Sequence, residues 1–179
     1  MDARLKSLEA EAGKRRDLEN PPLHLWHPPL SGDIPIVIAA DGRWYHDGGQ
    51  IKRHALVRLF ASILRREEDG DYYLVTPAEK WRISVEQHPL MVTDFELSAD
   101  VPHELRVTLN TDRQVTVDAE HPLYLDRQMN GIAVIRLAHG LSALFTRSAW
   151  YRLVEIAEEI DGVPSVTSCG DVYPLVDSA

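Results

Sequence analysis

The sequence predicts an α+β fold made of two related halves, in each of which a small sheet packs against one main helix. Three observations lead to this prediction. Short segments with alternating or wholly apolar residues, typical of strands, are separated by turns that contain Gly and Asp. Two longer segments, 52–66 and 143–160, repeat apolar residues with helical spacing. These two segments also share the pattern Arg-x-Ala-x-x-Arg-Leu, at 53–59 and 147–153.

The composition is that of an ordinary globular domain. Its 179 residues, 44% hydrophobic and 26% charged, suffice for one good core or two small ones. The single cysteine, Cys169, excludes an intramolecular disulfide, which agrees with a reducing compartment. No apolar run approaches the roughly 20 residues of a membrane span, and the first residues lack the apolar core of a signal peptide. We therefore expect a cytoplasmic protein that does not enter a membrane.

The charge balance limits the class of partner. The formal net charge is -9, from 28 acidic and 19 basic residues. Proteins that bind long nucleic acids usually carry a basic surplus, because neutralising phosphates supplies much of the affinity. Duplex and long single-stranded nucleic acids are therefore not expected as partners. A small anion remains compatible with an acidic chain, since a few convergent arginines can dominate the field inside a cleft.

The N-terminal region, 1–31, is expected to be an appendage of the first half. Residues 1–19 form a charged helix whose apolar stripe is thin, so we expect it to be peripheral or frayed. Residues 20–35 hold five prolines among apolar residues that include Trp26, which predicts an extended arm lying on a core. His24 and His27 have no carboxylate or thiol nearby in the sequence, so no metal site is expected there.

The first half, 32–97, is expected to contain strands and one helix. The strands are predicted at 34–40, 43–45, 72–75 and 81–85, and the helix at 52–66. The strand at 81–85 shows strict alternation of apolar and polar residues. The helix has one wide apolar face.

The second half, 98–179, begins after a loop-like segment at 96–103. Its predicted elements are a hairpin of 105–109 with 115–117, a strand at 132–137, a helix at 143–160 and a strand at 172–176. Pro174 lacks an N–H, so the last strand is expected at a sheet edge.

A duplication explains the repeated motifs. Besides the helical match, Gly-Asp-x-Tyr occurs at 70–73 and 170–173, and His-Pro-Leu occurs at 88–90 and 121–123. Two amphipathic helices can share one motif by chance, but matched flanking elements make chance a poor explanation. We infer that the halves are copies of one unit.

The paired arginines of the two helices suggest an anion site. Arg53 and Arg147 each lie in a first helical turn, where a cation opposes the helix dipole and needs compensation. The compensating group is either a bound anion or an acidic side chain of the protein. The glycines Gly48 and Gly49 precede the first helix and favour the anion, because such loops expose N–H groups to phosphate. The segment lacks the Walker A spacing.

No complete catalytic site is visible. The serines occupy no G-x-S-x-G elbow. The acid pairs 67–68 and 158–159 fall at helix ends or on exposed faces, and Cys169 is expected to be a small buried residue. His121 is expected either to face a cleft or to make a structural hydrogen bond. Arg136 shares its side of a strand with Val134 and is expected to point toward an interior or an interface, where it would need partners.

Several segments together resemble a known family. They are 32–35, 41–45, 49–53, 56–62, 69–72, 74–80, 83–86, Asn110, 121–123 and 134–136. The runs Leu-Val-x-Leu-Phe-Ala-Ser at 56–62 and Leu-Val-Thr-Pro-x-Glu-Lys at 74–80 are the more specific ones. The chain resembles the bacterial family called domain of unknown function 1285, from which it departs at 89–90 and 109–110.

The resemblance implies a two-part α/β arrangement whose second part is similar to a pleckstrin-homology-like domain. It also implies a small-ligand pocket between the halves, suited to a nucleotide-like molecule, and a role in signalling. We therefore expect a non-enzymatic ligand-binding protein without cofactor or metal. The expected ligand-binding residues are Arg53, Lys80, Asn110, His121, Arg136 and Arg147.

Two other functions stay open at this point. One is a hydrolase of a small phosphorylated ligand, with His121 and a nearby acid as the acid–base pair. The other is a protein-interaction module that docks a partner through the proline-rich arm around Trp26.

Overall fold

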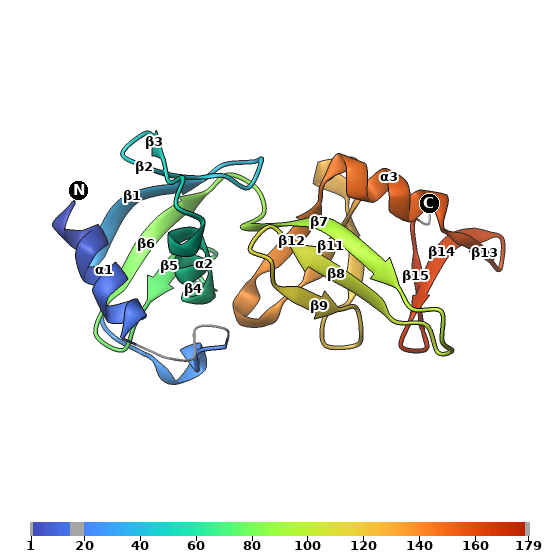
Figure 1. Cartoon of the computed structure of the whole chain (residues 1–179), viewed down its shortest axis with the longest axis horizontal. Helices are drawn as coiled ribbons and strands as arrows, with labels where there is room; N and C mark the ends of the chain where they lie inside the picture. Colours follow the sequence, from blue (N-terminus) through green and yellow to red (C-terminus); the bar gives the residue numbers. More distant parts are fainter. Residues whose placement is uncertain (1, 15–19, 178–179) are drawn as a thin grey trace. The chain divides into compact units, whose positions relative to one another are not determined.

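The computed structural model describes residues 2–14 and 20–177, which form two compact units, Met1–Pro89 and Leu90–Ala179 (Figure 1). The boundary between the units along the chain lies at 89/90, earlier than the expected boundary at 97/98. The reason is that the segment from 90 to 97 is a continuous strand, whose last residues were expected to belong to a loop. None of the helices in the described part of the chain is long and apolar enough to span a bilayer.

The N-terminal unit contains a six-stranded sheet in the order β3-β2-β1-β6-β5-β4. Its strands are β1 (Gly32–Ile38), β2 (Trp44–His46), β3 (Gly49–Gln50), β4 (Leu64–Arg66), β5 (Tyr72–Val75) and β6 (Lys80–Val85). The predicted strand at 72–75 is confirmed at both ends. The core contains Trp44 and Phe60, which are 1% and 0% exposed and whose ring centroids are 6.3 Å apart.

The C-terminal unit contains a second six-stranded sheet, in the order β10-β11-β12-β7-β8-β9, and a smaller sheet, β13-β14-β15. The strands of the larger sheet are β7 (Leu90–Leu97), β8 (Leu105–Leu109), β9 (Gln114–Thr116), β10 (Leu123–Asp126), β11 (Ile132–Arg136) and β12 (Ser142–Phe145). Those of the smaller sheet are β13 (Glu158–Ile160), β14 (Val163–Ser168) and β15 (Asp171–Pro174). Short 3₁₀ turns, η2 (Arg127–Met129) and η3 (Ala138–Gly140), flank β11.

The two six-stranded sheets have the same topology, so the predicted duplication and the α+β fold class are confirmed. Each sheet consists of two antiparallel three-stranded meanders whose first and last strands pair in parallel at the centre, β1 with β6 and β7 with β12. The main helices, however, occupy different places. Helix α2 (His54–Ser62) connects β3 to β4, whereas α3 (Arg147–Glu155) follows β12. The helical motif therefore matches two helices that are not equivalent in the duplicated topology.

Both main helices are shorter than expected. Helix α2 ends at Ser62, and the apolar run continues through Ile63 into β4, where Leu64 pairs with Leu74. The segment 143–160 divides into β12, α3 and β13, with Thr146 as the N-cap of α3. Apolar residues continue across each helix–strand junction, so the hydrophobic pattern alone did not reveal where the helices end.

The N-terminal helix and the arm both pack on the N-terminal unit. Helix α1 (Ala3–Gly13) contacts α2 and buries Leu5 and Leu8, which are 4% and 0% exposed. The expected helix is therefore confirmed for residues 3–13, where it packs on α2 and is not frayed; residues 15–19 lie outside the described part. The arm contains η1 (Leu23–Leu25) and lies on the core as expected, with Trp26 only 7% exposed.

Two further elements of the C-terminal unit test the sequence predictions. The hairpin of β8 and β9 is confirmed, with Val107 opposite Val115. The last strand, β15, is an edge strand that ends at Pro174, also as predicted. Cys169 is exposed rather than buried, because Cys169 and Gly170, both with positive φ, form the two-residue turn between β14 and β15.

Candidate functional site

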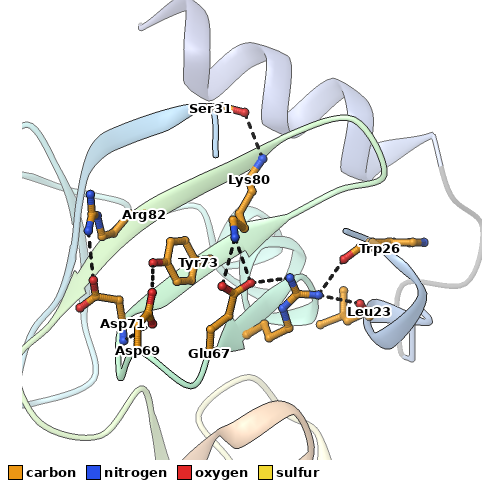
Figure 2. A network of polar contacts seen from close by, with 10 residues as sticks. Leu23, Trp26, Ser31, Glu67, Asp69, Asp71, Tyr73, Lys80 and Arg82 are labelled. Carbon is orange, nitrogen blue, oxygen red and sulfur yellow. Dashed lines mark hydrogen bonds and ion pairs between the residues drawn. The ribbon is translucent and has the colours of Figure 1, made fainter. Parts of the chain in front are cut away.

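A network of charged side chains covers the β4–β5–β6 meander of the N-terminal unit (Figure 2). Lys80, one of the expected ligand-binding residues, lies at its centre. The Lys80 Nζ atom is 3.1 and 3.3 Å from the two carboxylate oxygens of Glu67 and 4.8 Å from the centroid of the Tyr73 ring. The Lys80 side chain is only 18% exposed. Its ammonium group is thus held by a carboxylate and an aromatic face of its own unit.

Arg65 connects this network to the proline-rich arm. Its Nη2 donates to Glu67 Oε1 at 2.6 Å, and its Nη1 donates to the carbonyl oxygens of Leu23 and Trp26 at 2.8 and 2.9 Å. Trp26 is therefore buried against its own chain and bound through its backbone. This arrangement removes the observation on which the interaction-module hypothesis rested.

Glu67 is a central acceptor of the network, although the sequence predicted a solvated side chain. Burial alone would raise the pKa of the Glu67 carboxyl, but the hydrogen bonds from Arg65 and Lys80 outweigh burial and lower it. The ionised form of Glu67 is therefore stabilised in the folded protein. The other acid pair, Glu158 and Glu159, is exposed on β13 as expected.

Further charge pairs lie toward the Gly-Asp-x-Tyr turn. Tyr73 Oη donates to Asp69 Oδ2 at 2.5 Å, which raises the pKa of Tyr73 to about 12 and lowers that of Asp69. Arg82 donates to Asp33 at 2.7 Å and to Asp71 at 3.1 Å. These bonds raise the pKa of the Arg82 guanidinium. The motif residues of segments 69–72 and 74–80 thus meet in one internally paired cluster, whose evident role is to hold the meander together.

Arg53 is also paired with an acid of its own unit. It occupies the N-cap position of α2 and forms an ion pair with Glu9 of α1. The glycines expected to cradle a phosphate do not form the loop that enters the helix. Gly48 belongs to the two-residue turn between β2 and β3, and Gly49 begins β3. The acidic partner, the alternative to a bound anion, is therefore the one observed for Arg53.

Three expected residues of the C-terminal unit lie at one end of its large sheet. This is the end at which β7, β10 and β12 begin and β8 and β11 finish. Asn110 follows β8 and exchanges two hydrogen bonds with the backbone of Met91, at 2.9 and 3.1 Å. His121 precedes β10, and the adjacent Pro122 carbonyl accepts a hydrogen bond from the Arg136 N–H at 3.0 Å.

His121 has an acidic neighbour. Its Nδ1 is 3.3 Å from Asp118 Oδ1, and its backbone N–H donates to the same oxygen at 2.8 Å. Asp118 also accepts from the Glu120 N–H at 2.9 Å, so the carboxylate closes a turn before β10. The His121 side chain is 23% exposed. The sequence reasoning did not name Asp118, although the spacing Asp-x-x-His was a usable signal.

Arg136 is exposed, and it does not enter an interior. It shares the face of buried Val134, as its parity predicted, but it lies at the end of β11. Its guanidinium carbon lies 5.9 Å from the centroid of the Tyr124 ring, which is itself exposed. Among the described residues, Arg136 has no acidic partner. Tyr124 was missed because only the pairing of β10 with β11 brings it to Arg136.

Arg147 lies away from this group. Ser142 is opposite Arg136, whereas Arg147 follows the other end of β12. At about 3.3 Å per residue, the three steps from Ser142 to Phe145 alone separate the two ends of the strand by about 10 Å. Arg147 is exposed at the start of α3, whose N-terminus is capped by Thr146 Oγ1 accepting from the Ala149 N–H at 3.3 Å. No ion pair links Arg147 to another of the described residues.

Comparisons with known proteins agree with this two-unit division. The model of the N-terminal domain of the domain of unknown function DUF1285 matches residues 21–88, and that of the DUF1285 C-terminal domain matches residues 89–175. A search of curated proteins found no match.

Two crystal structures are similar to this chain. A DUF1285 family protein from Silicibacter pomeroyi DSS-3 is 36% identical, with a TM-score of 0.83 and coverage of 93% of each chain. A DUF1285 family protein from Shewanella baltica OS155 is 31% identical, with a TM-score of 0.58 over 68% of this chain and 91% of that one. Because both family models match in sequence order and together cover most of the chain, this protein belongs to the DUF1285 family.

Proposed function

We propose that this protein binds a small anionic, nucleotide-like ligand without transforming it, and that Arg136 is the main contact. The observation that carries the proposal is the state of Arg136: it is exposed, lies over the exposed ring of Tyr124 at 5.9 Å, and has no acidic partner in the described part of the chain. In a chain of net charge -9, an arginine without an acidic partner is worth testing as an anion contact.

The neighbouring groups suit such a ligand. A guanidinium can bind a phosphate through two parallel hydrogen bonds, and an aromatic ring can stack on a base. The ring of His121 and the amide of Asn110 belong to the same end of the sheet and add further polar groups. Lys80 and Arg53 are less suitable contacts, because Glu67 and Glu9 already pair with them. A protein that binds a nucleotide-like molecule without a complete catalytic set is suited to a signalling role.

The test is a thermal-shift screen of mononucleotides, cyclic nucleotides and inorganic phosphate, followed by calorimetry on any hit. A ligand that binds only the folded state raises the unfolding temperature by linkage. We expect Arg136→Ala to weaken binding at least tenfold and Tyr124→Ala to weaken binding of nucleotides more than that of phosphate.

The matched control is Arg106→Ala, which removes an exposed arginine of β8 that pairs with Glu104 near the other end of the same sheet. This variant is expected to bind like the wild-type protein. Flat responses to all ligands at millimolar concentration would contradict the proposal, as would equal losses in the Arg136 and Arg106 variants.

A hydrolase is the second candidate, favoured by the 3.3 Å separation of His121 Nδ1 and Asp118 Oδ1. In this arrangement the carboxylate orients the ring and Nε2 is the atom that would transfer a proton. The test is release of phosphate from the ligand found in the screen. Turnover that disappears in His121→Gln but persists in His103→Gln supports hydrolysis; binding without turnover supports the first candidate.

A further inference from the structure

A histidine and two aspartates meet where α1 begins beside the β2–β3 hairpin of the N-terminal unit. His46 Nε2 lies 3.7 Å from Asp2 Oδ2 and 3.8 Å from Asp47 Oδ2. One ligand atom from each residue lies within 4.8 Å of the others. The three residues come from two segments of the chain that are far apart in sequence, so the fold brings them together.

The imidazole nitrogen of this cluster is buried without a hydrogen-bond partner. His46 Nε2 is one of few buried side-chain nitrogen or oxygen atoms in the described residues that lack one. The distances to the two carboxylates exceed the 3.2 Å or so of an N–H···O bond. A buried polar atom without a partner has lost its hydration without compensation, so such an atom calls for an explanation, which a bound ion or water molecule can supply.

Each of the two carboxylates also has one oxygen directed at the histidine. Asp2 Oδ1 accepts from the Arg4 N–H at 3.1 Å and caps α1, which leaves Oδ2 for His46. Asp47 occupies the first position of the two-residue turn, with φ of 48°, before Gly48. Neither aspartate forms an ion pair with a lysine or arginine of the described residues.

We propose that Asp2, His46 and Asp47 bind one divalent transition-metal ion of the Zn²⁺ type. Imidazole nitrogen and carboxylate oxygen are both Zn²⁺ ligands, with bonds of about 2.0–2.2 Å. Such bonds place tetrahedral ligand atoms about 3.3 Å apart, so small side-chain rotations close the observed separations. The imidazole disfavours Mg²⁺ and Ca²⁺, which prefer oxygen ligands only. Water would complete the coordination, and the ion would fasten the start of α1 to the hairpin.

The experiment titrates the full chain with Zn²⁺ by calorimetry and follows the unfolding temperature. Two variants remove a ligand charge but keep the local structure. Asp2→Asn retains an N-cap residue, because Asn caps as well as Asp. Asp47→Asn retains the turn, because Asn-Gly favours the same turn conformation. A third variant, His46→Gln, removes the imidazole.

The control for binding elsewhere is the double variant His24→Ala/His27→Ala, which removes two exposed histidines of the arm. We expect one Zn²⁺ per chain, affinity at least tenfold lower in each ligand variant, and an unchanged affinity in the control. At a hundredfold excess of Zn²⁺ over the dissociation constant, the unfolding temperature should rise by about 5–11 °C, with no rise for Mg²⁺.

Two results would overturn the proposal. One is a wild-type protein that shows no saturable Zn²⁺ binding up to millimolar concentration. The other is Zn²⁺ binding of equal strength in wild-type, Asp2→Asn and Asp47→Asn. Either result would show that the cluster does not bind the metal ion.

Discussion

The two units compensate their positive charges in different ways. In the N-terminal unit, Arg65, Lys80 and Arg82 all pair with carboxylates of the β4–β5 connection or of β1. In the C-terminal unit, Arg136 lies over an aromatic ring and Arg147 has no ion pair with any residue that the structure describes. Other arginines of the C-terminal unit, such as Arg152 and Arg106, form ion pairs with side chains about half exposed, whereas the pairs of Arg65 and Lys80 are largely buried. The duplicated sheets carry different side-chain chemistry.

The strongest way to test this contrast is to remove the central acceptor of the N-terminal network. Glu67→Ala leaves Arg65 and Lys80, whose side chains are 12% and 18% exposed, without their carboxylate. Breaking a largely buried pair destabilises by several kcal/mol, and partial solvent access reduces this to about 2–3 kcal/mol. Urea denaturation followed by far-UV circular dichroism measures the change.

The matched variant in the other unit is Asp94→Ala, which breaks the Arg152–Asp94 pair with side chains 52% and 58% exposed. This exposed pair is screened by water, so its loss should change stability far less. A loss of stability in Asp94→Ala as large as that in Glu67→Ala would contradict the contrast between the units.

The network also predicts how stability depends on pH at the alkaline side. The pKa of Tyr73 is raised to about 12, first by its hydrogen bond to Asp69. A group whose pKa is raised on folding contributes its full stabilisation of the folded protein at pH values below its unfolded pKa, which is about 10 for tyrosine. This contribution is lost as the pH rises toward the pKa of the group in the folded protein. We therefore expect stability to fall between about pH 10 and about pH 12, and Tyr73→Phe to lose this part of the pH dependence.

Ultraviolet phenolate absorbance provides the measurement, because the chain should show a tyrosine that ionises only near unfolding. Tyr151→Phe, which removes an exposed tyrosine of α3, serves as the control and should leave the late ionisation unchanged. Because burial also raises the pKa of Tyr72 and Tyr173, some late ionisation should remain in Tyr73→Phe. A late ionisation of undiminished amplitude in this variant would contradict its assignment to the Asp69 hydrogen bond.

The loss of stability at acidic pH is predicted from Glu67. Its pKa is lowered on folding, so its contribution is present above the unfolded pKa and is lost as the pH falls through the folded value. Acid titration of the Glu67→Gln variant should therefore show a weaker loss of stability below about pH 4 than the wild-type protein.

How far the sequence predicted this molecule depended on whether the relevant contacts were local. The hairpin of β8 and β9 was predicted because alternation and turn residues are local signals. Strand β7 was not predicted. One reason is that its burial departs from alternation, with a register shift between Val92 and Asp94. Of the candidate site residues, the His121–Asp118 contact is local and could have been found. The Arg136–Tyr124 contact depends on strand register and could not.

The smallest expected effect concerns the two arginines that first suggested an anion site. Arg53 pairs with Glu9, whose side chain is 32% exposed, whereas the Arg53 side chain is 55% exposed. A double-mutant cycle of Arg53→Ala and Glu9→Ala should therefore give a coupling of about 0.2–1 kcal/mol that weakens with added salt. Arg147→Ala should leave stability unchanged or raise it slightly, because it removes a cation from a helix N-terminus.

This cycle decides what the shared helical motif means. Glu9 belongs to α1, which precedes the sheet of the N-terminal unit, and it is this helix that supplies the acid for Arg53. The same arginine at the start of α3 lacks such a partner among the described residues. If Arg147→Ala destabilised the protein as much as Arg53→Ala, an acid would compensate both arginines. The different environments of the two helices would then carry no functional information.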